Sequence, residues 1–367
     1  MFGFGKKKSQ SSTSQEPAPR PAQSTAEPVG DVTPGAVDAA AATKAVQLVA
    51  SGAGLTAVSD GTTRLWLQSA ALGLDELDLG GIDLRIDVSG SSESPLAHDA
   101  VMDWHGTLDD LDPIDIQRVV NTWNDSFVAP RVFSYEDSQG HTRVRGEMIT
   151  NWWEGHTVAQ LDEYLRAVVF GAMNLNQWLD EQWPDAVRQL PDTEASPGGV
   201  ALTGQPQDIA ATEKMAAQFI IPGNAFGFVF GDTAPVTPQR ITEDFASRSG
   251  QLSRVDEDGV LRIRWGQPAV DIAVNGDVLS VSSSAEVMLA DPENADPLLP
   301  VAWRWSTNRA GAVVVVHRNA DGSTSVIYAL HQFVGAGMTD RQLSATMSQT
   351  CELVADCMMG LADEITG

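Results

Sequence analysis

The chain contains very little cysteine. Its 367 residues include only Cys351 and Cys357. Two cysteines are too few for a disulfide framework, and their spacing matches no common set of metal ligands. The scarcity excludes the small, disulfide-stabilised secreted domains and suits a protein of a reducing cytoplasm.

Positive charge is also scarce. Lysine and arginine together number 23 against 49 aspartates and glutamates, which gives a formal net charge of −26. A surface of that sign repels phosphate backbones and anionic lipid headgroups, so we expect no nucleic-acid partner. Two explanations of the charge remain open: it prevents aggregation by self-repulsion, or it steers basic partners.

Long apolar runs are absent. The segment from Met215 to Phe230 comes nearest to one, but Pro222, Gly223 and Asn224 interrupt it, so no spanning helix is predicted. The opening MFGFGKKK places its lysines after the apolar residues and no apolar core follows, which is not the order of a secretory signal. We therefore expect a cytoplasmic protein without stable membrane insertion.

Two stretches have the composition of unfolded segments. Residues 1–30 are rich in Ser, Pro, Gln, Ala and Thr and contain almost no large apolar residue after Phe4, which predicts a disordered tail. A similar composition begins at Pro191 with PDTEASPGGVALTGQPQDIAAT and predicts a linker over residues 191–235. Two bodies remain, 31–190 and 236–367, and each is long enough to bury its own core.

The two bodies repeat one pattern. RVFSYEDSQGHTRVRG (131–146) and VVVVHRNADGSTSVIY (313–328) both predict two strands joined by a tight glycine turn. When Trp123 is set against Trp305, the bodies align without a gap over about sixty residues, at an offset of 182. Self-similarity at so long a period indicates a tandem duplication.

Each copy ends in a predicted long helix. Thr157-x-x-Gln160 and Thr339-x-x-Gln342 are capping boxes, in which the hydroxyl and the amide each satisfy a backbone group of the first turn. Apolar residues then recur in steps of three and four, as on one buried helix face. They are Leu161, Leu165, Val169, Ala172, Leu175 and Leu179 in the first copy, and Leu343, Met347, Cys351, Val354, Cys357 and Leu361 in the second. Both cysteines are thus predicted to be buried small hydrophobes rather than reactive thiols.

The remaining patterns complete the predicted order of elements. Asp60-Gly61 and Asp258-Gly259, followed by Gly80-Gly81 and Asn275-Gly276, are interpreted as matching hairpin turns. Each copy then consists of a helix, a three-stranded meander, an intervening segment, a hairpin and a closing helix. This order predicts the α+β class, with two tandem domains that each carry an antiparallel sheet and helices packed on one face.

Two segments carry a resemblance to a known family. Ile116-Gln-Arg-Val-Val-Asn-Thr-Trp-Asn124, the strand pair, and Glu154-Gly-His-Thr-x-x-Gln-Leu161 resemble the YbjN domain, also called the bacterial sensory transduction regulator family. The second copy keeps Gly337-Met-Thr-Asp-Arg-Gln-Leu343 but replaces both asparagines, and the resemblance covers roughly 290 of the 367 residues. It implies a fold similar to type III secretion chaperones, which bind polypeptide, often as dimers. Two copies in one chain would then pack as an internal pseudo-dimer.

The common catalytic motifs are absent. The chain has no G-x-S-x-G, no H-E-x-x-H, no Walker loop and no G-x-G-x-x-G after a strand, so we predict no catalytic residue and no cofactor. His98, Asp103 and His105 are of types that bind metals. A polar strand face is the favoured interpretation, because the second copy has no histidine there, and no metal is predicted.

Tryptophans mark the predicted binding site. Trp152 and Trp153 stand beside His156, and with Trp123 and Trp305 they are expected either to line a surface that captures an apolar segment of a partner or to cover the sheet. Asn121 and Asn124 either orient that surface or satisfy backbone groups at a helix end.

The resulting hypothesis is a non-enzymatic protein or peptide binder with a regulatory or chaperone-like role, whose partner is not identified by the sequence. Self-association is compatible with it. One alternative is a small-molecule sensor with a pocket between the domains. The other is an enzyme built from dispersed carboxylates such as Glu147, Glu154 and Glu163.

Overall fold

The structure is a computed structural model that describes most of the chain beyond the predicted tail. The described residues are 38–59, 61, 63–68, 79, 81–90, 96–190, 201–203, 209–216, 227–229, 231–249, 254–256, 259–264, 268–289, 291, 294–309 and 311–366. The predicted tail, Asp60, Gly80 and Asp258 lie outside them. In this part of the chain, no helix is both long enough and apolar enough to cross a membrane.

The N-terminal half, residues 39–216, contains a seven-stranded antiparallel sheet with the order β6-β7-β4-β3-β2-β1-β9. Its strands are β1 (Thr56–Ser59), β2 (Arg64–Gln68), β3 (Ile82–Ser89), β4 (Leu96–Trp104), β6 (Arg131–Glu136), β7 (Thr142–Trp152) and β9 (Ala201–Thr203). Its helices are α1 (Ala39–Gly52), α2 (Pro113–Ser126), α3 (Val158–Gln182) and α4 (Ile209–Ala216). The short strands β5 (Gly106–Thr107) and β8 (Val187–Arg188) pair with each other.

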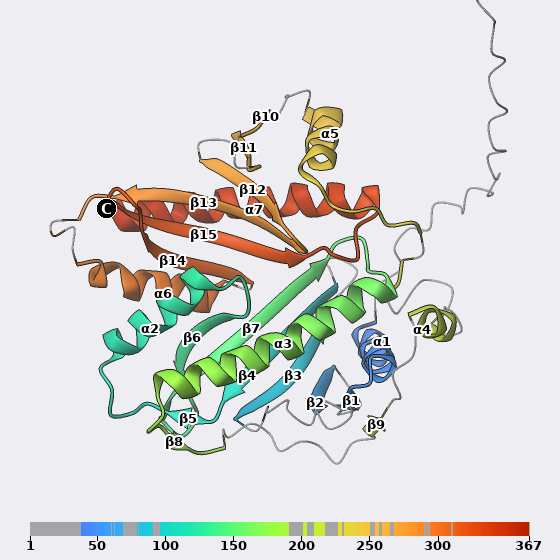
Figure 1. The fold of residues 1–367 in the computed structure, drawn as a ribbon, viewed down its shortest axis with the longest axis horizontal. Coiled ribbons are helices and arrows are strands. Elements are labelled where there is room, and N and C mark those ends of the chain that lie inside the picture. Colours follow the sequence, from blue (N-terminus) through green and yellow to red (C-terminus); the bar gives the residue numbers. More distant parts are fainter. Residues whose placement is uncertain are drawn as a thin grey trace, which may run out of the picture. The chain divides into compact units, whose positions relative to one another are not determined.

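The C-terminal half, residues 238–366, contains a six-stranded sheet with the order β10-β11-β12-β13-β15-β14. Its strands are β10 (Arg254–Val255), β11 (Leu261–Arg264), β12 (Ala269–Asn275), β13 (Val278–Val287), β14 (Ala312–Arg318) and β15 (Thr324–Phe333). Its helices are α5 (Pro238–Ser249), a 3-10 turn η3 (Asp296–Leu298), α6 (Leu299–Asn308) and α7 (Asp340–Thr366). Figure 1 shows α3 lying along the N-terminal sheet and α7 along the C-terminal sheet.

The two sheets share their strand order and, in the hairpins, their register. Arg131 pairs with Glu147 between β6 and β7, and Val313 pairs with Ala329 between β14 and β15. Each residue of the second pair lies 182 positions after its counterpart, which is the offset of the sequence alignment. The first residue of β15 lies at the same offset from the first residue of β7, and the first residue of α7 lies at that offset from the first residue of α3.

The predicted α+β class is confirmed. Along β3, Ile82, Leu84, Ile86 and Val88 are buried on the face that α1 and α3 contact, and the charged residues between them face the other way. Both predicted helix stripes are buried, including Cys351 and Cys357. Full burial of a leucine or valine side chain is worth about 1.5–3 kcal/mol, so these stripes fix each helix to its sheet.

Two details of the predicted order are wrong. Each meander has four strands rather than three, because β4 and β13 also pair within their sheets. Asn275-Gly276 joins β12 to β13, whereas Gly81 immediately precedes β3, the counterpart of β12, so these two turns are not equivalent. A turn dipeptide identifies a reversal of the chain but carries no information on which strand follows it.

The predicted linker contains regular structure. Ala201–Thr203 forms β9, which pairs antiparallel with β1, and Ile209–Ala216 forms α4, which packs against α1 and α3. Further on, Phe228 belongs to the core of the N-terminal half.

Candidate binding groove

The two halves meet through their middle helices and hairpins. α2 packs against β14 of the C-terminal sheet, α6 packs against β6 of the N-terminal sheet, and the two helices contact each other (Figure 1). Each helix therefore covers the hairpin edge of the other half. Unpaired strand edges are sites of unwanted pairing, and these two edges are protected.

Amide side chains on α2 bond both edge strands. Asn121 Nδ2 donates to the Val316 carbonyl at 2.9 Å, and the Val316 N–H donates back to Asn121 Oδ1 at 2.9 Å. Asn124 makes the same pair of bonds with Val132 of its own half, both at 2.8 Å. The two asparagines thus satisfy backbone groups of sheet edges, not of a helix end as one expectation had it.

The corresponding positions on α6 make the corresponding contacts. Trp303, 182 residues after Asn121, donates its indole N–H to the Ser134 carbonyl at 2.8 Å. Ser306, 182 residues after Asn124, accepts from the Val314 N–H at 3.0 Å. The side chains differ between the halves, but equivalent positions on α2 and α6 bond equivalent strands.

Two glutamines bond each other where α3 and α7 begin. Gln160 Nε2 donates to Gln342 Oε1 at 3.2 Å, and Gln342 Nε2 donates to Gln160 Oε1 at 3.0 Å. Gln160 also donates to the Gly337 carbonyl, and Gln342 donates to the Gly155 carbonyl, at 2.6 and 2.8 Å. Both predicted capping boxes are confirmed, because the same amide oxygens accept from the N–H groups of Thr157 and Thr339. Each glutamine thereby caps its own helix and also bonds the other half.

An open hollow, here called the junction groove, lies where β7 faces β15. About 530 Å³ of space free of protein atoms lies in it, part of which is open solvent. Its apolar lining consists of Ile149, Trp153, Leu279, Val281, Leu330 and Leu353. Its polar lining consists of Thr150, Asn151, Gln332, Thr346, Gln349 and Thr350, with Gly311 and His331 completing the wall.

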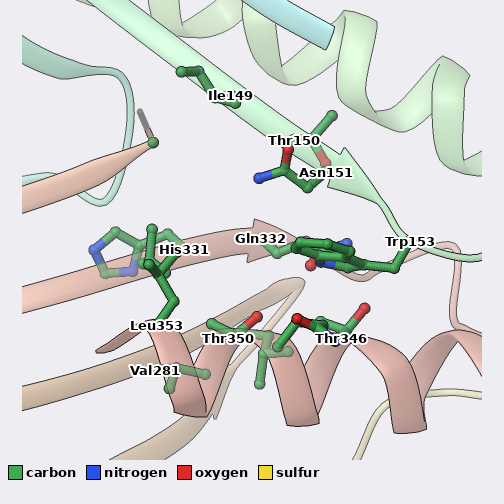
Figure 2. Close-up of a pocket in the computed structure, with 14 residues that line it drawn as sticks. Ile149, Thr150, Asn151, Trp153, Val281, His331, Gln332, Thr346, Thr350 and Leu353 are labelled. Carbon is green, nitrogen blue, oxygen red and sulfur yellow. The ribbon is translucent and has the colours of Figure 1, made fainter. Parts of the chain in front are cut away.

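Three elements supply most of this lining. Figure 2 shows Ile149 and Asn151 on β7, His331 and Gln332 on β15, and a row of α7 side chains below them. The α7 residues follow steps of three and four and therefore share one helix face. Two smaller hollows share lining residues with the groove, and Gln332 lines all three. One of them is also lined by Arg131, Glu147 and Tyr164, and the other by Glu154, Gln160 and Gln342.

The lining of the junction groove carries no Asp, Glu, Lys or Arg. Charged residues make up 20% of the chain, so a lining of this size would contain about three of them if drawn at random. The ring of His331 lies 2.8 Å from the Ser280 hydroxyl through Nδ1, and burial lowers its pKa to about 4. At neutral pH the groove presents only apolar groups, amides, hydroxyls and a neutral imidazole.

Carboxylates flank this uncharged lining. Asp99 stands directly opposite Ile149 in the β4–β7 ladder, so the two side chains are neighbours on one sheet face. Its Oδ1 atom is buried and has no hydrogen-bond partner, and burial, followed by the nearby Glu147, raises its pKa to about 7. On α7, the exposed Glu352 and Asp356 lie within one turn of Leu353.

The structure separates the tryptophans of the predicted site. Trp123 and Trp152 are buried, 1% and 5% exposed; the first donates to the Pro130 carbonyl and the second to His98. Trp305 is half-buried against Tyr328 and bonds Glu364. Only Trp153 contributes a half-buried side chain to the junction groove. The sequence did not indicate the groove's β15 and α7 walls, because they are brought to β7 by contacts across 180 or more residues.

His156, also predicted at the site, is fully buried in an aromatic cluster with His98, Trp152, Tyr164 and Phe228. The Trp152 indole can only donate, so His98 Nδ1 accepts and its proton sits on Nε2. Burial lowers the pKa of both histidines, that of His156 to about 4. Both rings are therefore neutral parts of the core.

The three residues considered as metal ligands do not converge. His98 is in the aromatic cluster, Asp103 is bonded by Arg145, Arg85 and Tyr135, and His105 faces Asp83 at 3.2 Å. Among the residues that the structure describes, no cluster of three or more His, Cys, Asp or Glu side chains has the geometry to hold a metal ion.

The three carboxylates of the enzyme hypothesis also lie apart. Glu147 forms a buried ion pair with Arg131, whose guanidinium also donates to carbonyls of the C-terminal half. Glu154 pairs with Arg341 at 2.8 Å, and Glu163 accepts from the Gly335 and Ala336 N–H groups at 2.7 and 2.9 Å. Glu154 and Glu163 bond the other half directly, Glu147 reaches it only through Arg131, and the three do not share a cleft.

No family model matches the chain, and no curated protein matches it. Solved structures match about a third of it. YbjN from E. coli aligns at 13% identity with a TM-score of 0.32, covering 36% of this chain and 96% of its own. The HopA1–SchA chaperone–effector complex aligns at 15% identity with a TM-score of 0.24, covering 33% and 97%. The Yersinia pestis type III secretion chaperone SycH, solved with a fragment of YscM2, aligns at 16% identity with a TM-score of 0.23, covering 34% and 98%.

Proposed function

We propose that this chain is a non-enzymatic protein-binding module with a regulatory or chaperone-like role, and that it holds its partner in the junction groove. The two halves are YbjN-like copies that act as an internal pseudo-dimer. The observation that carries the proposal is the groove itself, an uncharged hollow on an acidic protein, built from β7 of one half and β15 of the other.

The pseudo-dimer is supported by contacts that repeat at an offset of 182. Gln160 and Gln342 occupy equivalent positions and exchange equivalent hydrogen bonds, as residues on a two-fold axis do. Each glutamine also reaches the carbonyl of the equivalent glycine of the other half. In a two-fold dimer the same surface patch is used on both subunits, and the junction has this character within one chain.

The shape of the groove favours an extended chain segment over a small molecule. Pockets for small ligands enclose most of the ligand's surface. The junction groove is shallow, with enclosed room for only a few water molecules. Its amides and hydroxyls are suited to the backbone of a bound segment, and its aliphatic residues and Trp153 are suited to apolar side chains.

The proposal is tested by placing a polar group in the groove. Leu353 and Met359 both lie on α7 and are 39% and 43% exposed, but only Leu353 lines the groove. Leu353→Gln therefore changes the groove, and Met359→Gln is its matched control. Crosslinking capture from the native cytoplasm, with suppression of aggregation of an unfolded client as a second readout, is compared for the three proteins.

We expect the wild type and Met359→Gln to hold the same partner and Leu353→Gln to lose at least tenfold in yield. Equal capture by all three proteins would place binding elsewhere on the surface. A ligand-induced rise in unfolding temperature with metabolites, without any captured protein, would favour the small-molecule sensor instead.

A further inference from the structure

Charge around the junction groove restricts the chemistry of its occupant. The lining is uncharged, so a charged side chain seated on it would lose solvation without gaining an opposite charge. The central residues of a bound segment are therefore uncharged and apolar. This step rests on the proposed function, since it assumes that the groove holds a polypeptide.

The flanks of the groove have the opposite character. On the β7 side, Asp99 lies next to Ile149; its Oδ1 atom is buried without a hydrogen-bond partner, and Glu147, Arg131 and Arg85 are among the charged groups around it. On the α7 side, Glu352 and Asp356 are exposed one turn or less from Leu353. In α7 the only basic residue is Arg341, which is paired with Glu154. The α7 side therefore presents exposed, unpaired carboxylates, and the β7 side presents Asp99, a largely buried carboxyl that is partly ionised at neutral pH.

We infer that the occupant of the junction groove is an extended polypeptide segment with apolar residues at its centre and lysine or arginine on both flanks. Its apolar residues cover Ile149, Leu330 and Leu353. Its cationic groups pair with Asp99 on one side and with Glu352 and Asp356 on the other. Complementary charge of this kind sets the choice of partner and speeds association more than it adds affinity.

The inference is tested with three synthetic eight-residue peptides carrying a fluorophore. The first has a Val-Leu-Val-Leu centre with two lysines on each side, the second has the same centre with glutamates, and the third has a Ser-Gly centre with lysines. Binding to the full chain is measured by fluorescence anisotropy at low salt and at high salt.

We expect the lysine-flanked apolar peptide to bind at least tenfold more tightly than either of the others. The advantage over the glutamate-flanked peptide should shrink at high salt, because screening weakens exposed pairs. Asp99→Asn and Glu352→Gln should each reduce that advantage about two- to fivefold. Asp110→Asn, an exposed aspartate that does not line the groove, should leave it unchanged.

The outcomes separate the inference from the proposed function. Equal or tighter binding of the glutamate-flanked peptide overturns the inference, whereas loss of both apolar peptides in Leu353→Gln still supports a peptide groove. Equal binding of the Ser-Gly peptide shows attraction by net charge alone and also overturns it. If sedimentation shows that the wild type is a dimer and Leu353→Gln a monomer, the occupant is a second copy of the chain, which again overturns the inference. If no peptide and no cellular partner depends on Leu353, the proposed function itself fails.

Discussion

Replacing Asp99 by asparagine should stabilise the protein at pH 8. In the folded state the pKa of Asp99 is raised from 3.8 to about 7, chiefly by burial. The native state therefore holds its proton more tightly than the unfolded state, so stability falls as the pH rises from about 4 to about 7. A shift of this size lowers the free energy of unfolding by about 4 kcal/mol at pH 8. An asparagine amide without a partner costs about 1 kcal/mol, which leaves a net gain of about 3 kcal/mol.

Urea unfolding followed by tryptophan fluorescence measures this gain. It should be about 2–3 kcal/mol smaller at pH 5 than at pH 8, because at pH 5 the native Asp99 is already protonated. Asp109→Asn is the control of opposite sign, since the Thr142 N–H, at 2.7 Å, and His141 lower the pKa of that carboxyl. It should destabilise at pH 8. A pH-independent gain, or a loss of stability, in Asp99→Asn would refute the reasoning from burial and charge.

Three further predictions concern the core and the junction of the halves. The pKa of His156 is lowered to about 4, so the ring is neutral in the folded protein, and the free energy of unfolding falls as the pH drops below 6.5. His156→Phe should remove about 2 kcal/mol of the fall in unfolding free energy that urea titrations measure between pH 7 and pH 5. Gln160→Leu and Gln342→Leu should each lower the free energy of unfolding by about 2–3 kcal/mol. Because the two side chains bond each other, the double variant should lose about 1 kcal/mol less than the sum of the single variants, and additive losses would contradict the pairing. Cys351, whose pKa burial raises to about 12, should not react with a thiol reagent in the folded protein, and Cys351→Val should change stability by less than about 1 kcal/mol.

Local signals in the sequence predicted the elements well. The capping boxes at Thr157 and Thr339 form as expected, and Gly140 and Gly322 take φ values of 85° and 87° in their hairpin turns. These features depend on residues within a few positions of each other, and the sequence displays all of them. The repeat at an offset of 182 also predicted the equivalent registers of the two hairpins.

The lining of the proposed junction groove could be predicted only in part, for a reason that Trp152 and Trp153 make clear. Side chains of neighbouring residues in extended chain point to opposite sides. The two tryptophans therefore project to different sides of the chain, and the structure buries Trp152 in the core while Trp153 lines the groove. The alternation of side chains can be predicted from the sequence, but which side of the strand is buried depends on where α3 packs.

The second role of Gln160 illustrates a more general limit. A capping box is complete once the amide oxygen bonds the N–H of Thr157, and nothing nearby in sequence requires a partner for the amide nitrogen. That partner, Gln342, lies 182 positions away and becomes apparent only when the two helix starts are brought together. Exact repetition of a polar residue at the offset of 182 is the one sequence signal for such a contact.

Asp99 connects the stability of the chain with the proposed occupant of its groove. A carboxyl with a pKa of about 7 is only partly ionised at neutral pH, and it must be ionised to pair with a lysine. The affinity for the lysine-flanked peptide should therefore rise about two- to fivefold from pH 6 to pH 8 in anisotropy titrations. Asp99→Asn should abolish this rise and at the same time stabilise the free protein. A rise that persists in Asp99→Asn would mean that another group carries the charge. A carboxylate that lowers the stability of the free protein and is paired only in the complex is, in physical terms, a site prepared for a cation.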